Sequence, residues 1–381
     1  MNIWITLAHG GAILACFAYV ALIILFTIGW FRLRYTEFST APGIATVTVV
    51  IAARNEEENI GICLAAIISQ DYPRSLFGII VVDDHSTDGT LMVINRVIEG
   101  NPGINIRLLQ LTAEEQGKKT AISKAIAVAQ NEWIVTTDAD CVMGANWLSS
   151  LMAGAVDPEV QMLLAPVIFR KTKTVFGQMQ ELEFLSLIAS SAGAVSTGLP
   201  VMCNGANLAY RREAFFKAGG YTSDKGFASG DDVFLMMKIR QMYNSRAIKF
   251  IKSPSSGVIT YANETLYEFL NQRLRWVSKA KGYKDLWVLL VSGIVFTQSF
   301  LLLITTLAWA TGFIKPILPL ILFTAKFLAD LPIMASACGF AKRRKLMIWY
   351  LPLQFIYPVY LVAMGMIGNI LSFRWKGRKF R

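Results

Sequence analysis

Four long apolar stretches constrain the fold of this chain more than any other feature of its sequence. Residues 3–31, 286–313 and 317–340 are each long enough to span a bilayer as a helix, and residues 346–373 form a fourth stretch. Composition agrees, since 54% of the 381 residues are hydrophobic and the mean hydropathy is +0.46. We therefore expect a membrane protein with an N-terminal anchor and C-terminal transmembrane helices.

The net charge of +11 comes largely from basic clusters beside these apolar stretches. Arg32 and Arg34 follow the first stretch, residues 342–345 follow the third, and residues 374–381 form a basic tail. Under the positive-inside rule the N-terminus lies outside and the next domain lies in the cytoplasm, at a bacterial inner membrane. No basic run with interleaved aromatic residues occurs in a soluble stretch, so we expect no nucleic-acid partner.

The last apolar stretch does not fit this pattern as a simple span. Basic clusters flank it on both sides, although a single crossing must place one of them outside. Pro352 and Pro358 are expected to break its helix. The stretch is a hairpin or a segment lying in the interface, and we favour a cytoplasmic C-terminus.

The cysteine and histidine content argues against structural zinc. Five cysteines are scattered without a Cys-x-x-Cys pair, and only two histidines occur. This pattern fits a reducing compartment.

Residues 44–261 have a globular composition in which β-branched runs alternate with helical patterns. Strands are expected at residues 47–52, 79–82, 104–109 and 133–137. Helices are expected at residues 57–69, 90–99 and 119–129. Such alternation predicts an α/β fold with a mostly parallel sheet, whose ligands bind beyond the carboxyl ends of the strands. Polar clusters follow three of these strands, at residues 54–56, 83–84 and 138–140.

Residues 262–285 are predicted to form an amphipathic helix. Thr265 and Glu268 have the spacing of a capping box, one apolar stripe runs along the helix, and several of its other residues, including Arg273, are basic. A helix on the inner membrane surface and an ordinary domain helix fit this pattern equally well. Further along, Lys326 and Asp330 stand four residues apart in the third apolar stretch and are expected to pair while facing other helices.

Several short motifs have residue types suited to chemistry. Asp138-Ala139-Asp140 follows a strand, and two carboxylates so placed suit Mg²⁺ or Mn²⁺ with the phosphates that the cation holds. Asp84 begins a polar loop in which later residues can cap a helix. Asp231 and Asp232 open a helix, where one can act as a general base or both can simply favour the helix dipole. The other motifs are Asn204-Gly205-Ala206-Asn207 and Gln272-Arg273-Leu274-Arg275-Trp276.

In their order and context these motifs resemble the membrane-bound family 2 inverting glycosyltransferases, a group that includes ceramide glucosyltransferases and poly-N-acetylglucosamine synthases. The resemblance covers roughly residues 46–282 and implies a GT-A fold, which is Rossmann-like with a mostly parallel sheet. The implied domains are an anchor at 1–35, a GT-A domain at 44–261, an interface helix at 262–285, a transmembrane region at 286–373 and a basic tail at 374–381.

The resemblance also implies roles for individual residues. Asp84 is expected to contact the uracil of a UDP-sugar, with Glu56 near the nucleotide and Lys118 beside the uridine end. Asp140 would bind the metal directly, and Asp138 the ribose or donor sugar. The remaining assignments are Asp232, or Asp231 in its place, as catalytic base; Gln272, Arg275 and Trp276 at the pyrophosphate; and Asn204 and Asn207 on the acceptor side.

Three functions are compatible with these motifs. The first is transfer of one sugar to a membrane lipid, which the small number of predicted spans favours. The second is processive synthesis of a polysaccharide. The third is a non-catalytic scaffold or transporter with a degenerate nucleotide-sugar fold, and the presence of all the expected acidic residues argues against it.

Overall fold

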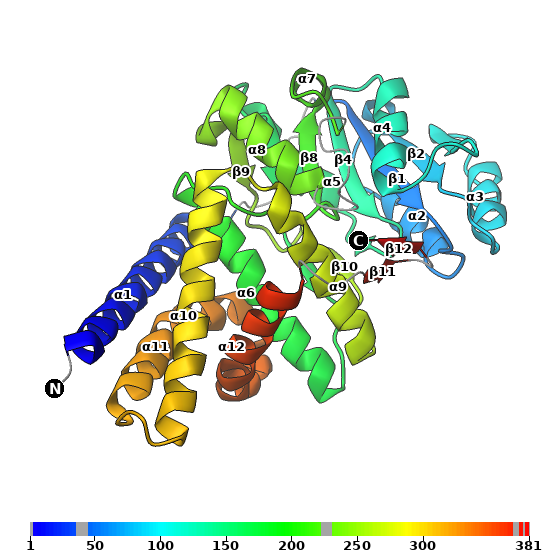
Figure 1. The fold of residues 1–381 in the computed structure, drawn as a ribbon. Helices are drawn as coiled ribbons and strands as arrows, with labels where there is room; N and C mark the ends of the chain where they lie inside the picture. The colour runs from blue at the N-terminus through cyan, green and yellow to red at the C-terminus, as the bar shows by residue number, and fades with distance from the viewer. Residues whose placement is uncertain (1–2, 36–44, 222–230, 369–372, 376–377, 381) are drawn as a thin grey trace.

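The computed structural model describes residues 3–35, 45–221, 231–368, 373–375 and 378–380 of the chain. Figure 1 shows two regions: a sheet covered by helices at the upper right, and a group of long helices at the lower left. The sheet lies within residues 45–250, and the long helices come from both ends of the chain. This arrangement matches the expected combination of an α/β part with helices long enough to span a membrane.

A seven-stranded sheet in the order β3-β2-β1-β4-β8-β6-β9 forms the centre of the α/β part. The pairs β1–β2, β1–β4, β2–β3 and β6–β9 are parallel, whereas β8 is antiparallel to both of its neighbours. The predicted mostly parallel sheet is therefore confirmed. Its strands are β1 (Val47–Ala53), β2 (Phe77–Asp83), β3 (Ile106–Gln110), β4 (Trp133–Asp138), β6 (Met162–Leu164), β8 (Leu208–Arg211) and β9 (Ile248–Phe250).

The burial of the strands explains why runs of β-branched residues in the sequence predict them. Every residue of β2 is buried, as are six of the seven residues of β1. Sheets of this kind have both faces covered, so their strands are continuously apolar.

The helices of the α/β part are α2 (Ile60–Ile68), α3 (Thr90–Glu99), α4 (Lys118–Val128), α5 (Trp147–Met152), α6 (Val175–Ser196), α7 (Arg212–Lys217), α8 (Asp231–Tyr243) and α9 (Leu266–Ser278).

A second, three-stranded sheet in the order β5-β10-β7 lies beside the first. It consists of β5 (Val142–Met143), β7 (Val167–Phe169) and β10 (Val258–Thr260). β10 is antiparallel to β5 and parallel to β7. β5 begins two residues after Asp140. This small sheet therefore holds the chain that follows the predicted metal-binding residues.

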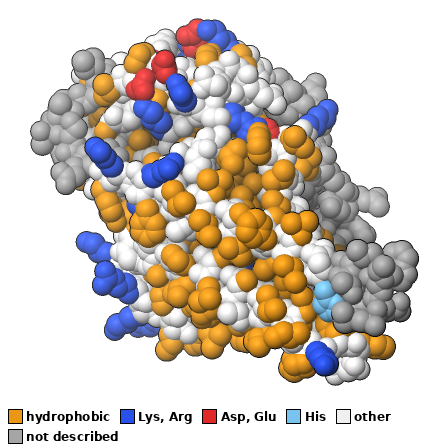
Figure 2. Space-filling view, turned by 90° about the vertical axis from the view of Figure 1, so that its left-hand side faces the viewer, with side chains coloured by type: hydrophobic (Ala, Val, Ile, Leu, Met, Phe, Trp, Pro, Cys, Tyr) orange, Lys and Arg blue, Asp and Glu red, His pale blue; other side chains and the backbone are white. Residues whose placement is uncertain are grey.

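The helical part contains α1 (Ile3–Arg32), α10 (Leu286–Ala310), α11 (Ile317–Phe340) and the segment Arg344–Ile367. These four are long and apolar enough to cross a membrane. Figure 2 shows hydrophobic side chains gathered in a broad band over this part, with Lys and Arg side chains along its upper and left borders. An exposed apolar band of this extent fits contact with lipid.

The last apolar stretch differs from its predicted form. It folds as a short 3₁₀-helix, η6 (Arg344–Trp349), followed by the continuous helix α12 (Tyr350–Ile367). Pro352 lies in the first turn of α12, where its missing amide hydrogen costs little, and Pro358 lies inside the helix. The expectation that both prolines break the helix was wrong. Beyond α12, the antiparallel strands β11 (Phe373–Trp375) and β12 (Arg378–Phe380) begin one residue before the predicted basic tail and continue into it.

The predicted pair between Lys326 and Asp330 is present in α11, with 2.6 Å between Nζ and Oδ2. Lys326 Nζ also donates to Gln354 Oε1 in α12 at 2.5 Å, and the Tyr19 hydroxyl in α1 donates to Asp330 Oδ1 at 2.7 Å. All these groups are buried. The pair therefore faces the other helices, as expected, and joins three of them.

Helices α1 and α6 cross at two glycines that leave no space for a side chain. A Cβ atom on Gly193 would lie 2.0 Å from the Phe26 carbonyl oxygen, and one on Gly29 would lie 2.2 Å from the Gly193 carbonyl oxygen. Because backbone atoms form the obstacle, no rotamer change can relieve the contact. The N-terminal helix is thus closely fitted to the α/β part through α6.

We expect Gly193→Ala to lower the stability of the fold by about 1–3 kcal/mol, the usual effect of overpacking. Thermal unfolding of the detergent-solubilised protein measures this change. Gly11→Ala in α1 is the matched control, since nothing lies within 4 Å of its Cβ position. Equal melting temperatures for the two variants would contradict the close crossing.

Candidate active site

The carboxyl ends of three neighbouring strands bring the predicted polar clusters to one edge of the sheet. In the strand register Ala53 of β1 pairs with Asp83 of β2, and Ala52 pairs with Asp138 of β4. The chain therefore leaves all three strands at the same level. The predicted convergence of residues 54–56, 83–84 and 138–140 is confirmed.

Two of the loops at this edge are joined by hydrogen bonds. Asn55 Oδ1 accepts from the Thr87 amide at 2.8 Å, and Glu57 Oε2 accepts from the Gly89 amide at 2.7 Å. Asp88, which precedes the N-cap residue Gly89 of α3, accepts from the Thr90 amide at 3.0 Å. Among the described residues of this loop that follow Asp84, only Asp88 bonds an amide at the start of α3, and Asp84 lies at the pocket wall.

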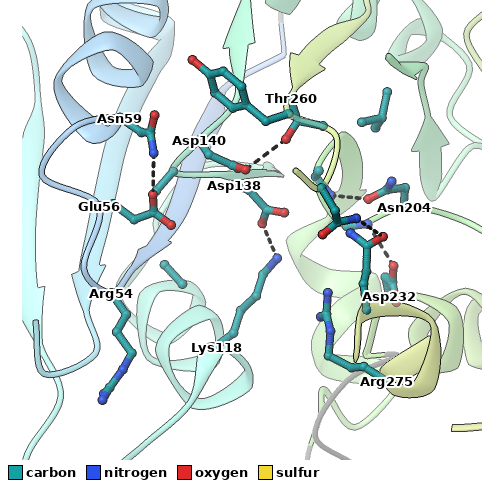
Figure 3. A pocket seen from close by; sticks show the side chains of 18 of the residues that line it. Arg54, Glu56, Asn59, Lys118, Asp138, Asp140, Asn204, Asp232, Thr260 and Arg275 are labelled. Atoms are coloured by element: carbon teal, nitrogen blue, oxygen red, sulfur yellow. Dashed lines mark hydrogen bonds and ion pairs between the residues drawn. The ribbon is translucent and has the colours of Figure 1, made fainter. Parts of the chain in front are cut away.

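A pocket of about 800 Å³ lies beyond this edge. Figure 3 shows Asp138 and Lys118 in its centre, with Glu56 and Asp140 on one side and Asp232 and Arg275 on the other. Eleven predicted site residues line it: Glu56, Asp84, Lys118, Asp138, Asp140, Asn204, Asp231, Asp232, Gln272, Arg275 and Trp276. Segments far apart in the sequence therefore contribute to one concave surface.

Carboxylates crowd the part of the pocket around Asp140. Burial raises the pKa of the Asp140 carboxyl, and the negative charges of Asp138 and Glu56 raise it further. Thr260 Oγ1 donates to Asp140 Oδ2 at 3.0 Å, and the Lys118 ammonium pairs with Asp138. Buried carboxylates that repel one another favour a bound cation, so the residues present fit Mg²⁺ or Mn²⁺.

Among the described residues, no three His, Cys, Asp or Glu side chains are arranged to ligate one metal ion. This agrees with the chemistry of Mg²⁺, which proteins commonly bind through one or two carboxylates together with phosphate oxygens of the substrate. The protein's own share of such a site would be Asp138 and Asp140.

Asp84 and Lys118 also line the pocket, and the Gly117 backbone connects them. Asp84 Oδ2 accepts from the Gly117 amide at 3.1 Å, and the Arg54 guanidinium lies 3.8 Å from Asp84 Oδ1. Lys118 begins α4 directly after Gly117, and its side chain reaches Asp138. The backbone next to Lys118 is thus near Asp84, the residue expected at the uracil. The ammonium group of Lys118 lies beside the predicted metal ligand Asp138.

The two acidic residues that open α8 have different surroundings. Asp232 Oδ2 accepts from the Gly205 amide and Oδ1 from the Val233 amide, both at 2.9 Å. Asp231 Oδ1 lies 2.9 Å from Lys119 Nζ, and burial raises the pKa of its carboxyl against the effect of that ammonium. Two backbone amides therefore hold the Asp232 carboxylate, whereas the Asp231 carboxylate is held in an ion pair with Lys119.

Asn207 does not take the predicted place on the acceptor side. Its side chain is 1% exposed and is absent from the pocket lining, unlike that of Asn204. The Asn207 amide donates to the carbonyl oxygens of Pro166 and Ser256, both at 2.8 Å, and accepts from Trp147 Nε1 at 3.0 Å. These bonds tie β8 to neighbouring loops, so Asn207 has a structural role here.

Helix α9 presents Gln272, Arg275 and Trp276 to the pocket. The predicted capping box at its start is confirmed, with Thr265 accepting from the Glu268 amide and Glu268 returning a bond. Burial lowers the pKa of the Arg275 guanidinium, against the raising effect of Asp138 and Asp232. A cation held near these carboxylates can stabilise a diphosphate.

Arg273, one of the basic residues of the predicted amphipathic helix, is buried. It is 2% exposed, ion-paired with Glu183 of α6 at 2.5 Å, and its guanidinium lies 4.1 Å from the Trp276 ring centre. A second ring, that of Phe269, lies 4.7 Å away. The sequence pattern cannot distinguish a solvent-facing arginine from one paired with a distant glutamate.

We expect Glu183→Gln to destabilise the protein by about 3–5 kcal/mol, because it leaves Arg273 buried without its partner charge. Thermal unfolding in detergent measures the change. Glu159→Gln is the control, since Glu159 is exposed. A melting temperature equal to that of the control would show that the pair does not hold α9 on α6.

Some pocket contacts could not be anticipated from the motifs. Thr260 ends β10 and reaches Asp140, Lys119 reaches Asp231, and Asn263 Nδ2 donates to Gln272 Oε1 at 3.0 Å. Lys119 follows the predicted Lys118 directly, which is a weak signal. Thr260 ends a strand as the other site residues do, but that strand belongs to the second sheet.

Comparison with known proteins agrees with this geometry. Residues 48–218 match the family described as "Glycosyl transferase family 2". The chain contains a family 2 glycosyltransferase domain. In the structure this matched region includes Glu56, Asp84, Lys118, Asp138 and Asp140, while Asp232 and α9 follow it.

Two relatives are similar in sequence to parts of this chain. A poly-β-1,6-N-acetyl-D-glucosamine synthase of Staphylococcus aureus is 24% identical over 237 residues, which are 60% of this chain and 53% of the synthase. The chain thus spans about half the length of that relative. The glycosyltransferase AglE of Haloferax volcanii is 33% identical over 102 residues, 27% of this chain and 33% of AglE.

A mannosyltransferase structure from Pyrobaculum calidifontis, in complex with GDP-mannose and Mn²⁺, has a TM-score of 0.59 at 22% identity. The match covers 94% of this chain and 98% of that chain. It shows the GT-A fold of the domain, as the sequence predicted.

Proposed function

We propose that the protein is a metal-dependent inverting glycosyltransferase that moves a sugar from a UDP-sugar to a lipid acceptor at the membrane. The observation that carries this proposal is the single pocket onto which Asp84, Asp138, Asp140, Asp232 and Arg275 converge. A large pocket with convergent polar groups is the usual form of a ligand site.

The donor would lie along the edge of the sheet. Asp84 would accept hydrogen bonds from the uracil, with Glu56 and Lys118 near the nucleotide. Asp140 and Asp138 would hold Mg²⁺ or Mn²⁺, which supplies positive charge to the departing diphosphate. Arg275 and Gln272 would contact the same diphosphate from α9, and the guanidinium stabilises its negative charge where that charge develops.

Asp232 would act as general base toward the acceptor. Two backbone amides orient its carboxylate, whereas the Asp231 carboxylate is paired with Lys119. Asp232 would take the proton of the acceptor hydroxyl while that oxygen forms its bond to the anomeric carbon. The bond to the diphosphate breaks on the opposite side, so the anomeric configuration inverts.

The acceptor would approach from the side of Asn204, Trp276 and α9, next to the long apolar helices. We infer that the glycosyltransferase domain is cytoplasmic and works at the inner membrane of a bacterial cell envelope. A lipid acceptor held near its site is already concentrated and oriented, which increases the rate of transfer.

A second candidate, processive synthesis of a polysaccharide, is favoured by the similarity to the poly-N-acetylglucosamine synthase. The two functions differ in their product. Purified protein in lipid nanodiscs would be incubated with labelled UDP-sugars, and the lipid extract would be sized. A lipid carrying one sugar supports the first function, and a ladder of lengths supports the second. Absence of transfer from every nucleotide sugar, with intact protein, would contradict both.

A further inference from the structure

We propose that the last apolar segment, η6 with α12, is a re-entrant hairpin that enters the membrane from the side of the glycosyltransferase domain and returns to that side. By length and composition the segment could cross. The contacts at its two ends and at its midpoint decide otherwise, and they do not depend on the catalytic proposal.

The segment begins on the domain side. α11 ends at Phe340, whose ring lies 5.5 Å from that of Trp30 near the end of α1. Lys252, which follows β9 of the domain, donates to the Trp30 carbonyl oxygen at 2.7 Å. Arg343 then lies 3.6 Å from Glu181 of α6. The basic residues 342–345 are therefore on the domain side of the helical part.

The midpoint of the segment lies deep among the long helices. The Tyr350 hydroxyl donates to the carbonyl oxygen of Phe327, and Gln354 contacts both Lys326 and Asp330. Phe327 precedes Phe340 by thirteen residues in one helix, which corresponds to about 20 Å at 1.5 Å per residue. α12 therefore starts roughly halfway along α11.

The segment ends back at the domain side, against α9. The ring centres of Tyr360 and Phe269 lie 5.5 Å apart, Met364 packs with Leu274, and a Cβ on Gly368 would lie 2.7 Å from Val277 Cγ1. α9 lines the pocket of the domain and is joined to α10 by the short 3₁₀-helix η5 (Lys279–Gly282), so it lies on the domain side. Figure 1 shows α12 rising toward α9.

The break between η6 and α12 is covered by protein, as irregular backbone at membrane depth must be. Leu346 and Tyr350 are buried, and Trp349 Nε1 donates to Gln178 Oε1 of α6 at 2.7 Å. Pro352 in the first turn of α12 removes one amide that would otherwise lack a partner. The outer side of the hairpin exposes Leu351, Phe355, Ile356 and Val359, which suit lipid chains.

This topology also explains why basic clusters flank the last apolar stretch on both sides. Residues 342–345 and 374–381 then lie on one side of the membrane, so both satisfy the positive-inside rule. The hairpin packs against the face of α9 that carries Leu274 and Val277. It thereby connects the helix that lines the pocket with the lipid of one leaflet.

The test uses the full-length protein in sealed vesicles of known orientation and a membrane-impermeant maleimide. Glu99→Cys reports the domain side, Lys315→Cys the opposite side, and a C-terminal epitope tag is probed by added protease. Wild-type protein gives the background from its five native cysteines. We expect the tag to be cleaved in the orientation that labels Glu99→Cys; cleavage in the orientation that labels Lys315→Cys would overturn the hairpin.

A second variant tests whether the start of α12 lies inside the membrane. Leu351→Cys lies at the start of α12, where the native side chain is half exposed. We expect it to be labelled only after detergent is added. Labelling in intact vesicles would show that the segment lies on the membrane surface instead of entering it.

Discussion

Asp232→Asn is expected to lower kcat by about 10²- to 10⁴-fold, the usual contribution of a general base. The variant keeps the size of the side chain and one oxygen, which can accept from the amide of either Gly205 or Val233, and we expect the fold to be retained. UDP affinity should change little, because the donor would be held by other residues. Initial rates at saturating donor, with UDP binding measured in parallel, test both statements.

Asp231→Asn is the matched comparison, since it changes the neighbouring residue in the same way. Asp231 is paired with Lys119, so we expect a smaller loss of kcat from its substitution. Full activity of Asp232→Asn would contradict the assignment of the base. A larger loss in Asp231→Asn than in Asp232→Asn would move that role to Asp231.

Asp140→Asn is expected to reduce transfer at least about a hundredfold at a metal concentration that saturates the wild type. Substitution of a group that only orients a metal ligand already lowers metal affinity or activity by about 10- to 100-fold. Asp140 is the predicted ligand itself, so we expect a loss at least as large. Raising the Mn²⁺ concentration should restore part of the rate, because an amide oxygen binds the cation more weakly than a carboxylate. Rates measured over a metal titration give the shift of the midpoint.

The control for this substitution is Asp157→Asn, which removes an exposed carboxylate paired with Lys249. Its rate and metal midpoint should equal those of the wild type. If Asp140→Asn retained the wild-type midpoint, the metal would not be held at Asp140.

The sheet edge could be predicted from the sequence because it depends on local patterns. Buried parallel strands are runs of β-branched residues, and the first polar residue after each run marks the end of a strand. Asp84, Asp138 and Asp140 were placed in this way. α9 was also predictable, since the capping box of Thr265 and Glu268 is a short-range signal.

Contacts between distant segments could not be predicted in this way. Arg273 has the pattern of a surface residue, and only the position of Glu183 ninety residues earlier explains its burial. Asn207 lies in the same motif as Asn204, yet the bonds to Pro166 and Ser256 turn it away from the pocket. The path of the last apolar segment depends on where α11 and α9 lie, which no local pattern specifies.

The central claim, a metal-dependent nucleotide-sugar site at Asp138 and Asp140, can be tested without knowing the sugar or the acceptor. Calorimetric titration of UDP into the purified protein, with Mn²⁺ and then with excess EDTA, measures the coupling directly. We predict binding with Mn²⁺ that is lost in EDTA and returns when the metal is restored. UDP binding of equal affinity in both conditions, or no binding in either, would contradict the account.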